Sequence, residues 1–343
     1  MLVFHSPDAV RHDPHRFFRR GVVMPHPESV ERYLTLRDAA EKAGHQLVEA
    51  SDHGLAPLAA VHDQGYLDFL RDAWSMGIAT DPDLEEIMTT QFARGAIKRR
   101  PSGFLGLVSY HSADTSTAIR EGSWAASYGA AQAALSAADA LETARVTYAL
   151  SRPPGHHAGH DHSSGFCFLN NAAIAAHHLS QKHGKVAILD VDVHHGDGTQ
   201  ALFYRRSDIL TVSLHAATDN YFPYFTGYAD EAGAGEGEGY NLNLPLAHGS
   251  GDDIYIDAIR RGLDRIAGHD AGALIVSLGL DAADADPVGV LNVTSDGFRR
   301  AAEVIAQVDM PVLLVQEGGY PCEALGRNLD AFLSGFESVA AAA

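Results

Sequence analysis

The sequence predicts an α/β protein built on a mostly parallel β-sheet with helices on both faces. Short apolar runs of strand length alternate along the chain with segments of helix length, which is the pattern of repeated βαβ units. The apolar runs are nearly continuous, as is typical of strands covered on both faces. Acids, imidazoles and glycines follow several of these runs directly, at the end of the strand where an open α/β sheet binds its ligands.

The individual elements follow from apolar runs and from helix start and stop signals. Pro27-Glu28-Ser29 opens the first predicted helix and Gly44 closes it, while Ser295-Asp296 precedes the last one. Strands are expected at residues 2–5, 146–150, 186–189, 209–214, 273–278 and 312–315. Helices are expected at residues 28–43, 64–74, 123–143, 170–182, 252–267 and 296–306.

Residues 1–343 are predicted to form a single domain, since the chain contains no internal repeat and no low-complexity linker. Residues 77–106 have no clean period and are interpreted as a long surface insertion, either a lid or an oligomer contact. The basic run Lys98-Arg99-Arg100 within it is interpreted as a solvated face. The glycine-rich loop 229–239 has no lysine and carries four acids, so it does not suit a phosphate.

Composition excludes several classes of function. The balance of 25 Lys+Arg against 44 Asp+Glu gives a net charge of −19, which disfavours nucleic acids and anionic membranes as partners. The two cysteines have no CxxC spacing, which indicates neither a disulfide framework nor a zinc ribbon. No apolar run reaches the roughly 20 residues that span a bilayer. The first residues lack a leader pattern, so a cytoplasmic protein is expected.

The segment Asp190-Val-Asp-Val-His-His-Gly-Asp197 is the strongest chemical signal in the chain. It directly follows the apolar run 185–189. Side chains of a strand alternate between its faces, so Asp190, Asp192 and His194 are expected to point the same way. Two acids and an imidazole that converge at the end of a strand are costly without a cation. The segment therefore predicts half of a metal site.

Four other segments place reactive side chains at the ends of predicted strands. They are Arg152–Gly159 with its paired histidines, the Gly165–Asn171 loop, the strand that ends at Asp281, and Gln316–Tyr320. Each has an ordinary alternative when taken alone: a solvated histidine, a helix cap or a packed aromatic. Because parallel strands end at one rim, the segments together predict one site.

These segments resemble the zinc-dependent histone deacetylase family. The matching motifs occur in the order of that family: Arg-Pro-Pro-Gly-His-His, Gly-Phe-Cys-Phe-Leu-Asn-Asn, Asp-Val-Asp-Val-His-His-Gly-Asp-Gly-Thr-Gln, Val-Ser-Leu-His and Glu-Gly-Gly-Tyr. Within the family, the chain looks most like the bacterial branch that contains the acetylpolyamine amidohydrolases. The resemblance extends from about Val3 to the last helix, and it implies an arginase/deacetylase-like fold.

The resemblance implies a metal centre and two histidine–aspartate pairs. Its ligands would be Asp192, His194 and Asp281, which hold one Zn²⁺, although Fe²⁺ also suits this set. Asp190 and Asp197 match acids that hold His156 and His157 respectively. His157 would be the general base for the metal-bound water that attacks the carbonyl, and then the acid for the leaving amine. His156 would be chiefly an electrostatic partner.

The resemblance also implies a tunnel and bound monovalent cations. Tyr320 would donate a hydrogen bond to the carbonyl as it becomes an oxyanion. Phe166 and Phe222 match the walls of a narrow tunnel for a linear alkyl-amine, in which the carbonyl of Gly165 accepts the scissile N–H. Structural K⁺ or Na⁺ would lie at Asp190, Asp192, His194, Ser213 and Leu214, with a second cation near Phe203 and Tyr240.

At some positions the sequence differs from the residue patterns of the arginases and of the acetylpolyamine amidohydrolases. Gly196 and Ala283 stand where the two-manganese arginases carry further ligands, which argues for a single metal and for amide hydrolysis. Leu105 and Ser116 stand where acetylpolyamine amidohydrolases place glutamates at the tunnel mouth, which leaves Asp114 as the nearest acid. The 77–106 insertion resembles a loop that narrows the tunnel and helps to form a homodimer.

The reaction predicted from the resemblance is hydrolysis of the linear amide of a small N-acetylated amine such as an acetylpolyamine. A second hypothesis is the same chemistry on acetyl-lysine in proteins or peptides, or on another linear amide. A third is a non-catalytic binding module, which predicts that a metal ligand or the tyrosine is lost. This chain retains every matching position.

Overall fold

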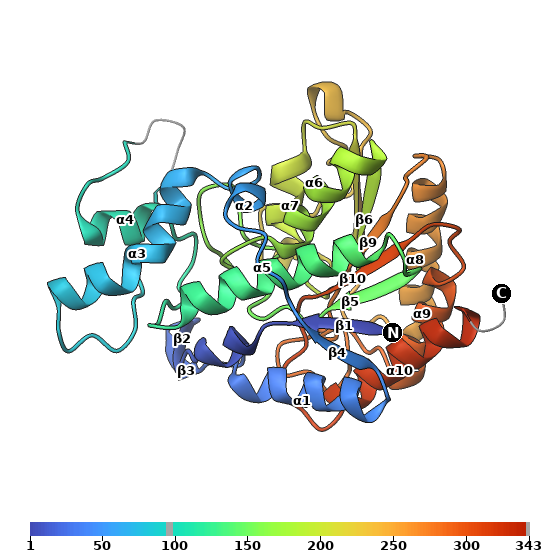
Figure 1. Ribbon diagram of the computed structural model, residues 1–343, viewed down its shortest axis with the longest axis horizontal. Coiled ribbons are helices and arrows are strands. Elements are labelled where there is room, and N and C mark those ends of the chain that lie inside the picture. The colour runs from blue at the N-terminus through green and yellow to red at the C-terminus, as the bar shows by residue number, and fades with distance from the viewer. Residues whose placement is uncertain (94–98, 341–343) are drawn as a thin grey trace.

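The computed structural model, which describes residues 1–93 and 99–340, is built around an eight-stranded parallel sheet (Figure 1). Its strands in chain order are β1 (Leu2–His5), β4 (Gln46–Glu49), β5 (Val146–Ala149), β6 (Val186–Asp190), β7 (Ile209–Ala216), β8 (Asn241–Leu246), β9 (Leu274–Leu278) and β10 (Val312–Gln316). In space they lie in the order β4-β1-β5-β10-β9-β6-β7-β8, and every pair is parallel. The predicted α/β fold class is confirmed.

Helices cover both faces of the sheet (Figure 1). One face packs against α1 (Val30–Lys42), α8 (Asp252–Ala267), α9 (Ser295–Ile305) and α10 (Leu325–Ala340). The other packs against α5 (Ser123–Ala140), α6 (Asn171–His183) and α7 (Asp197–Phe203), and its apolar layer continues away from the sheet into α2 (Ala56–Ala59), α3 (Gln64–Thr80) and α4 (Phe104–Tyr110). Short 3-10 helices are η1 (Pro7–Arg11), η2 (Thr218–Asn220) and η3 (Gly235–Gly237).

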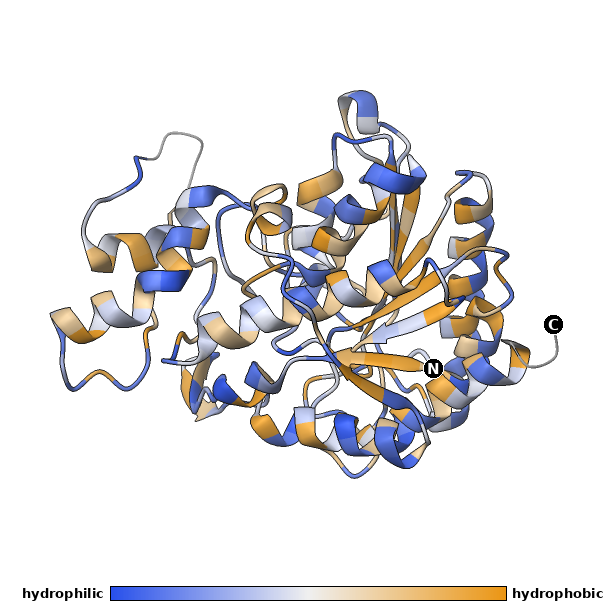
Figure 2. Cartoon of the chain, in the orientation of Figure 1, coloured by the Kyte–Doolittle hydropathy of each residue, from blue (hydrophilic) through white to orange (hydrophobic). Residues whose placement is uncertain are grey.

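Alternation along the strands divides the core into two layers. In β6, Ala187 and Leu189 join the layer under α8 and α9, whereas Val186 and Ile188 join the layer under α5 and α6. All five residues of β6 are buried, which explains why the strand is apolar on both faces. Figure 2 shows the hydrophobic strands between helices that are hydrophilic on their outer sides.

The prediction missed the two outermost strands of the sheet and a hairpin. β4 and β8 carry polar residues and are partly exposed at the sheet edges, so neither reads as an apolar run. The hairpin pairs β2 (Arg16–Arg19) with β3 (Val22–Pro25) and turns at Arg20 and Gly21, both with positive φ. Its strands carry arginines and exposed valines, which gave no strand signal.

The predicted insertion at residues 77–106 begins inside α3 and ends inside α4. Between these helices, residues 81–93 and 99–103 contain neither helix nor strand beyond a single bridge from Ile87 to Ile119. Lys98 and the stretch 94–98 lie outside the described residues, while Arg99 and Arg100 are exposed. α3 and α4 extend away from the sheet on the left of Figure 1. In the described part of the chain, no helix has the length and apolar character of a membrane span.

Candidate active site

Three side chains that could hold a metal ion meet beyond the carboxyl ends of β6 and β9. Asp192 and His194 follow β6, and Asp281 follows β9. His194 Nδ1 lies 3.1 Å from Asp192 Oδ1 and 3.3 Å from Asp281 Oδ2. One ligand atom from each residue falls within 4.8 Å of the others. The cluster offers one imidazole nitrogen and two carboxylates, the donor set of a catalytic zinc site.

The convergence of this cluster has a different cause from the one expected. β6 ends at Asp190, so strand alternation does not orient Asp192 and His194. Instead the loop folds over the acids, because the amides of Asp192 and His194 donate to the carboxylates of Asp190 and Asp192 at 3.1 and 2.9 Å. The amide of Val193 donates to Asp281 Oδ1 at 3.1 Å, which joins the β6 loop to the β9 loop.

The charges of the cluster fit a cation. Both carboxylates are fully buried, and Asp281 Oδ2 accepts no hydrogen bond from the described residues. Burial and the neighbouring charge of Asp192 raise the pKa of Asp281. Burial opposes a charge on His194, yet its contacts with Asp192 and Asp281 raise its pKa to about 9. Two buried carboxylates favour a positive charge between them, which a divalent metal bound by this cluster would supply.

Two histidine–aspartate pairs lie beside the cluster. His156 Nδ1 contacts Asp190 Oδ2 at 2.9 Å, and His157 Nδ1 contacts Asp197 Oδ1 at 2.7 Å. The two rings are 4.0 Å apart. Burial and the charge of His156 lower the pKa of His157 to about 4, so this imidazole is neutral and can accept a proton at neutral pH. Burial disfavours a charge on His156, but the charges of Asp192 and Asp190 raise its pKa well above the usual value.

A buried glutamate that the sequence analysis did not select holds the histidine loop. Glu317 Oε2 accepts hydrogen bonds from the amides of Gly155 at 2.6 Å and His156 at 3.0 Å. Burial raises the pKa of Glu317 to about 7. Its position inside the Glu-Gly-Gly-Tyr motif was the available signal, but only the structure shows which loop it holds.

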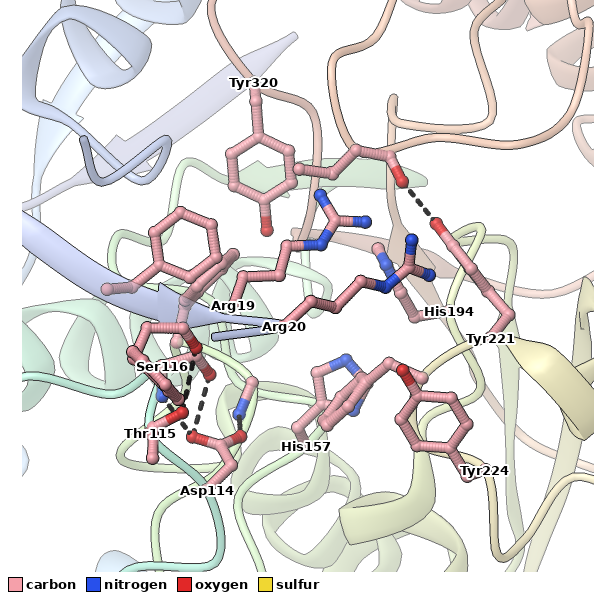
Figure 3. Close-up of a pocket in the computed structure, with 16 residues that line it drawn as sticks. Arg19, Arg20, Asp114, Thr115, Ser116, His157, His194, Tyr221, Tyr224 and Tyr320 are labelled. Carbon is pink, nitrogen blue, oxygen red and sulfur yellow. Dashed lines mark hydrogen bonds between the residues drawn. The ribbon is translucent and has the colours of Figure 1, made fainter. Parts of the chain in front are cut away.

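Tyr320 lies opposite the histidine pairs on the β10 loop. Its amide donates to Asp286 Oδ2 at 2.8 Å, and its ring meets the ring of Phe166 edge-on at 5.6 Å. Burial and the charge of Asp281 raise the pKa of the Tyr320 hydroxyl well above its usual value, so it stays protonated. The loop can therefore present a hydroxyl donor across the pocket from His157 (Figure 3).

These residues line a pocket with a volume of about 280 Å³ (Figure 3). The predicted tunnel residues Gly165, Phe166 and Phe222 belong to its lining, together with His157 and His194. The ring of Phe222 meets that of His157 edge-on at 4.9 Å. Gly165 has φ +52, and a Cβ on it would lie 2.3 Å from His157, so only glycine suits this wall. The pocket is lined by several aromatic rings, and His194 of the candidate metal cluster is part of its lining.

Sequence reasoning missed several residues of this pocket. Tyr221 stacks on His194 with ring centres 4.8 Å apart, and its hydroxyl donates to the carbonyl of Val288 at 2.6 Å. Its place next to Phe222 was the available signal. The remaining missed lining residues come from the hairpin and from nearby loops: Phe17, Phe18, Arg19, Arg20, Thr115, Tyr224 and Val288.

Of the residues predicted to bind monovalent cations, Asp190 and Ser213 are neighbours in the sheet, whereas Phe203 and Tyr240 lie in separate segments of the chain. Asp190 of β6 pairs in register with Ser213 of β7, and Leu214 follows. The Ser213 hydroxyl contacts His215 Nδ1 at 2.8 Å. Phe203 ends α7 and is buried, whereas Tyr240 precedes β8 and is half-buried. The cation sites at these residues stay a prediction.

The structure shows the surroundings of the positions at which this sequence differs from the arginases and from the acetylpolyamine amidohydrolases. A Cβ on Gly196 would lie 2.3 Å from Asp190 Oδ2 and 3.3 Å from His156 Nδ1, so the histidine–aspartate pair occupies the space of any side chain there. Ala283 is buried. Leu105 is 70% exposed on α4 and is not part of the pocket lining, whereas Ser116 and Asp114 are.

Gly196→Ala should lower activity about 10- to 100-fold, because it displaces a residue that orients the histidine next to the metal ligands. We expect a stability loss of about 1–3 kcal/mol from overpacking. Steady-state kinetics and thermal unfolding check both effects. Gly268→Ala is the matched control: its φ of −78° is close to the −73° of Gly196, but its nearest new contact would be an ordinary 3.6 Å. Equal effects of the two substitutions would contradict the explanation.

Comparison with known proteins agrees with this geometry. The histone deacetylase domain model matches residues 26–336. The chain is 43% identical over 338 residues to an acetylpolyamine amidohydrolase of Burkholderia pseudomallei, covering 98% of each chain. It is 39% identical over 318 residues to an acetylpolyamine amidohydrolase of Mycoplana ramosa, covering 92% of this chain and 93% of that protein. A crystal structure of acetylpolyamine aminohydrolase from Burkholderia pseudomallei superposes with a TM-score of 0.95 at 42% identity and covers 99% of each chain.

The fold and the site define a metal-dependent hydrolase of the amidohydrolase and deacetylase type. The chain belongs to the histone deacetylase family. The family and the reaction class predicted from the motifs are thereby confirmed.

Proposed function

We propose that the protein hydrolyses the N-acetyl amide of a small linear amine, the chemical class that includes the acetylated polyamines named for its relatives. The observation that carries this proposal is that the Asp192, His194 and Asp281 cluster reaches an aromatic pocket through His194, which is part of the pocket lining. A pocket of about 280 Å³ admits a linear chain in preference to a branched or bulky group.

The metal in this proposal is one zinc ion held by the cluster. The unpartnered Asp281 Oδ2 and the two buried carboxylates support a divalent cation, and the nitrogen-plus-carboxylate donors suit zinc, with Fe²⁺ as the alternative. When bound, the ion would polarise the amide carbonyl and increase the acidity of a water molecule. Gly196 and Ala283 offer no ligand for a second ion.

The chain's own residues supply the proton transfers. His157 is neutral and buried against Asp197, so it accepts a proton from the attacking water and returns it to the leaving amine. His156 carries positive charge between Asp190 and Asp192 and acts electrostatically. Tyr320 donates a hydrogen bond from its hydroxyl to the oxygen that gains charge as the carbonyl is attacked. Phe166 and Phe222 line the pocket and exclude water around the alkyl chain.

Two further predictions belong to the same proposal. Asp190, Asp192, His194, Ser213 and Leu214 are proposed to hold a structural K⁺ or Na⁺, supported by the in-register pairing of Asp190 with Ser213. A homodimer through the insertion is supported by exposed apolar side chains on this part of the chain, Met88 at 41% and Leu105 at 70%.

A comparison of small and peptide substrates tests the proposed function. With the zinc-loaded protein, we expect kcat/KM for N-hexylacetamide or N-acetylputrescine to exceed that for an acetyl-lysine peptide by about 10-fold or more, because the narrow pocket mouth disfavours a bulky backbone. A strong preference for the peptide would replace the small amine with acetyl-lysine as the substrate. Failure to hydrolyse any of the three would contradict the reaction itself.

A further inference from the structure

We propose that the preferred substrate carries a carboxylate at the end of its chain that is remote from the amide, so that it is a linear acylamino acid. This inference rests on the proposed function and narrows its substrate class. Its basis is a pair of arginines, Arg19 and Arg20, that line the pocket beside the catalytic groups. In Figure 3 both side chains extend from the hairpin across the pocket, between Tyr320 and His157.

The hairpin is anchored where it meets the pocket. The amide of Phe18 donates to the carbonyl of Thr115 at 3.4 Å, and the Thr115 hydroxyl donates back to the carbonyl of Phe18 at 2.9 Å. Phe17 is buried and meets the tunnel residue Phe166 edge-on at 5.8 Å. Because strand residues two apart share a face, Arg19 points to the same side as Phe17, which is the side of the pocket.

The two arginines have no internal partner for their charge. Among residues 1–93 and 99–340, no carboxylate lies within ion-pair distance of Arg19 or Arg20, and neither guanidinium makes a hydrogen bond. Arg16 on the same hairpin is different, since it pairs with Glu86 at 3.2 Å. Arg19 is half-buried and Arg20 is exposed, so both remain accessible to a ligand in the pocket.

Asp114, the acid in the pocket lining, already accepts hydrogen bonds from neighbouring residues through both of its carboxylate oxygens. Its Oδ2 accepts from the amide of Gly165 at 2.6 Å and from the hydroxyl of Ser164 at 3.1 Å. Its Oδ1 accepts from the amide and hydroxyl of Ser116, each at 2.8 Å, and from the Thr117 hydroxyl at 3.3 Å. These five bonds shape the Gly165 wall and leave the carboxylate poorly placed to bind an ammonium group.

The charge at the outer pocket therefore favours an anion over a polycation. Two unpaired guanidinium groups would repel the ammonium of an acetylated diamine, whereas their planar donors match a carboxylate. The same pocket is lined by His157, His194 and by the hairpin, so a linear chain with its amide at His194 would extend its far end toward the arginines. A linear acylamino acid has an amide for the catalytic groups at one end and a carboxylate for the two arginines at the other.

Three substrates with the same spacer test this inference: 6-acetamidohexanoate, N-acetylcadaverine and N-hexylacetamide, which end in a carboxylate, an ammonium and a methyl group. With the zinc-loaded protein we expect kcat/KM to be highest for the carboxylate, by about 10-fold or more over the ammonium. Arg19→Gln and Arg20→Gln should each lower the ratio of kcat/KM for the carboxylate to kcat/KM for N-hexylacetamide by about 10-fold, mainly through the KM of the carboxylate.

Reversal of the charge at both arginines provides a second test. The double variant Arg19→Glu with Arg20→Glu should prefer N-acetylcadaverine over 6-acetamidohexanoate. The control is Arg11→Gln, an exposed arginine on η1 that pairs with Asp8 outside the pocket, and it should leave the order of the three substrates unchanged.

The outcomes separate this inference from the proposed function. Equal use of the three substrates, a preference for N-acetylcadaverine, or arginine variants with wild-type selectivity would overturn the carboxylate while leaving amide hydrolysis intact. A protein that hydrolyses none of the three would refute the proposed function and this inference together.

Discussion

Asp281→Asn is expected to remove the metal and to lower kcat/KM by at least about 10³-fold. A Lewis-acidic metal contributes several kcal/mol to the stabilisation of the transition state, and each 1.4 kcal/mol is about a factor of ten in rate. Asp281 Oδ2 is a buried carboxylate oxygen that accepts no hydrogen bond within the described chain, so its replacement by an amide would remove a ligand and put N–H donors next to the metal. Metal analysis of the purified variant and steady-state kinetics measure the two losses.

Thermal unfolding distinguishes a metal ligand from a structural acid in the same experiment. Zinc should raise the melting temperature of the wild type but not that of Asp281→Asn, because only a folded state that binds the ion is stabilised by it. Without metal, the variant should be at least as stable as the wild type, since the charge of Asp192 raises the pKa of Asp281 and repulsion between the two acids is removed.

Asp284→Asn is the matched control, because Asp284 is an exposed acid in the same loop. It should keep both metal and rate. An Asp281→Asn protein with a full complement of zinc would contradict the assignment of this residue as a ligand.

Tyr320→Phe is expected to lower kcat/KM about 10²- to 10³-fold, the usual cost of removing one hydrogen-bond donor to an oxyanion. The loss should appear in kcat, because the hydrogen bond strengthens as the carbonyl oxygen gains charge. Burial and Asp281 keep the hydroxyl protonated, so it remains a donor over the working pH range. Kinetics with N-hexylacetamide measure the effect without a contribution from charge at the outer pocket.

The metal content and fold of Tyr320→Phe should be unchanged, which separates it from Asp281→Asn. Tyr128→Phe is the control, since that hydroxyl donates to the exposed Asp52 and neither residue belongs to the pocket lining. Full activity in Tyr320→Phe would show that another group stabilises the oxyanion.

The buried elements were predictable because their pattern is local. Residues 252–267 were predicted as a helix, and α8 has the same bounds, since its apolar stripe and its flanking glycines are visible in the sequence. β6, β7, β9 and β10 were predicted to within two residues at each end, because strands buried on both faces are continuous apolar runs. β4 and the β2–β3 hairpin lack such runs, since β4 lies at an edge of the sheet and the hairpin strands carry exposed residues.

In the site, the residues named from motifs lie together in the structure, but the reason for their arrangement was not visible in the sequence. Strand alternation was expected to align Asp190, Asp192 and His194, whereas the loop after β6 is bent by amide–carboxylate hydrogen bonds. Glu317 and Asp286 support the catalytic loops through backbone amides. A backbone donor has no signature in a sequence, so such contacts appear only once the chain is folded.

By itself, the sequence identified the family and the reaction class, because its motifs resemble those of the family in residues and in order, and this resemblance predicted the candidate metal ligands and the histidine pairs. The local apolar pattern showed that these residues stand at strand ends. The tertiary structure alone decided the character of the pocket mouth. The hairpin that carries Arg19 and Arg20 contacts Thr115 and Phe166, which belong to loops far along the chain. Contacts over that separation depend on how the loops pack, and packing leaves no period in the chain.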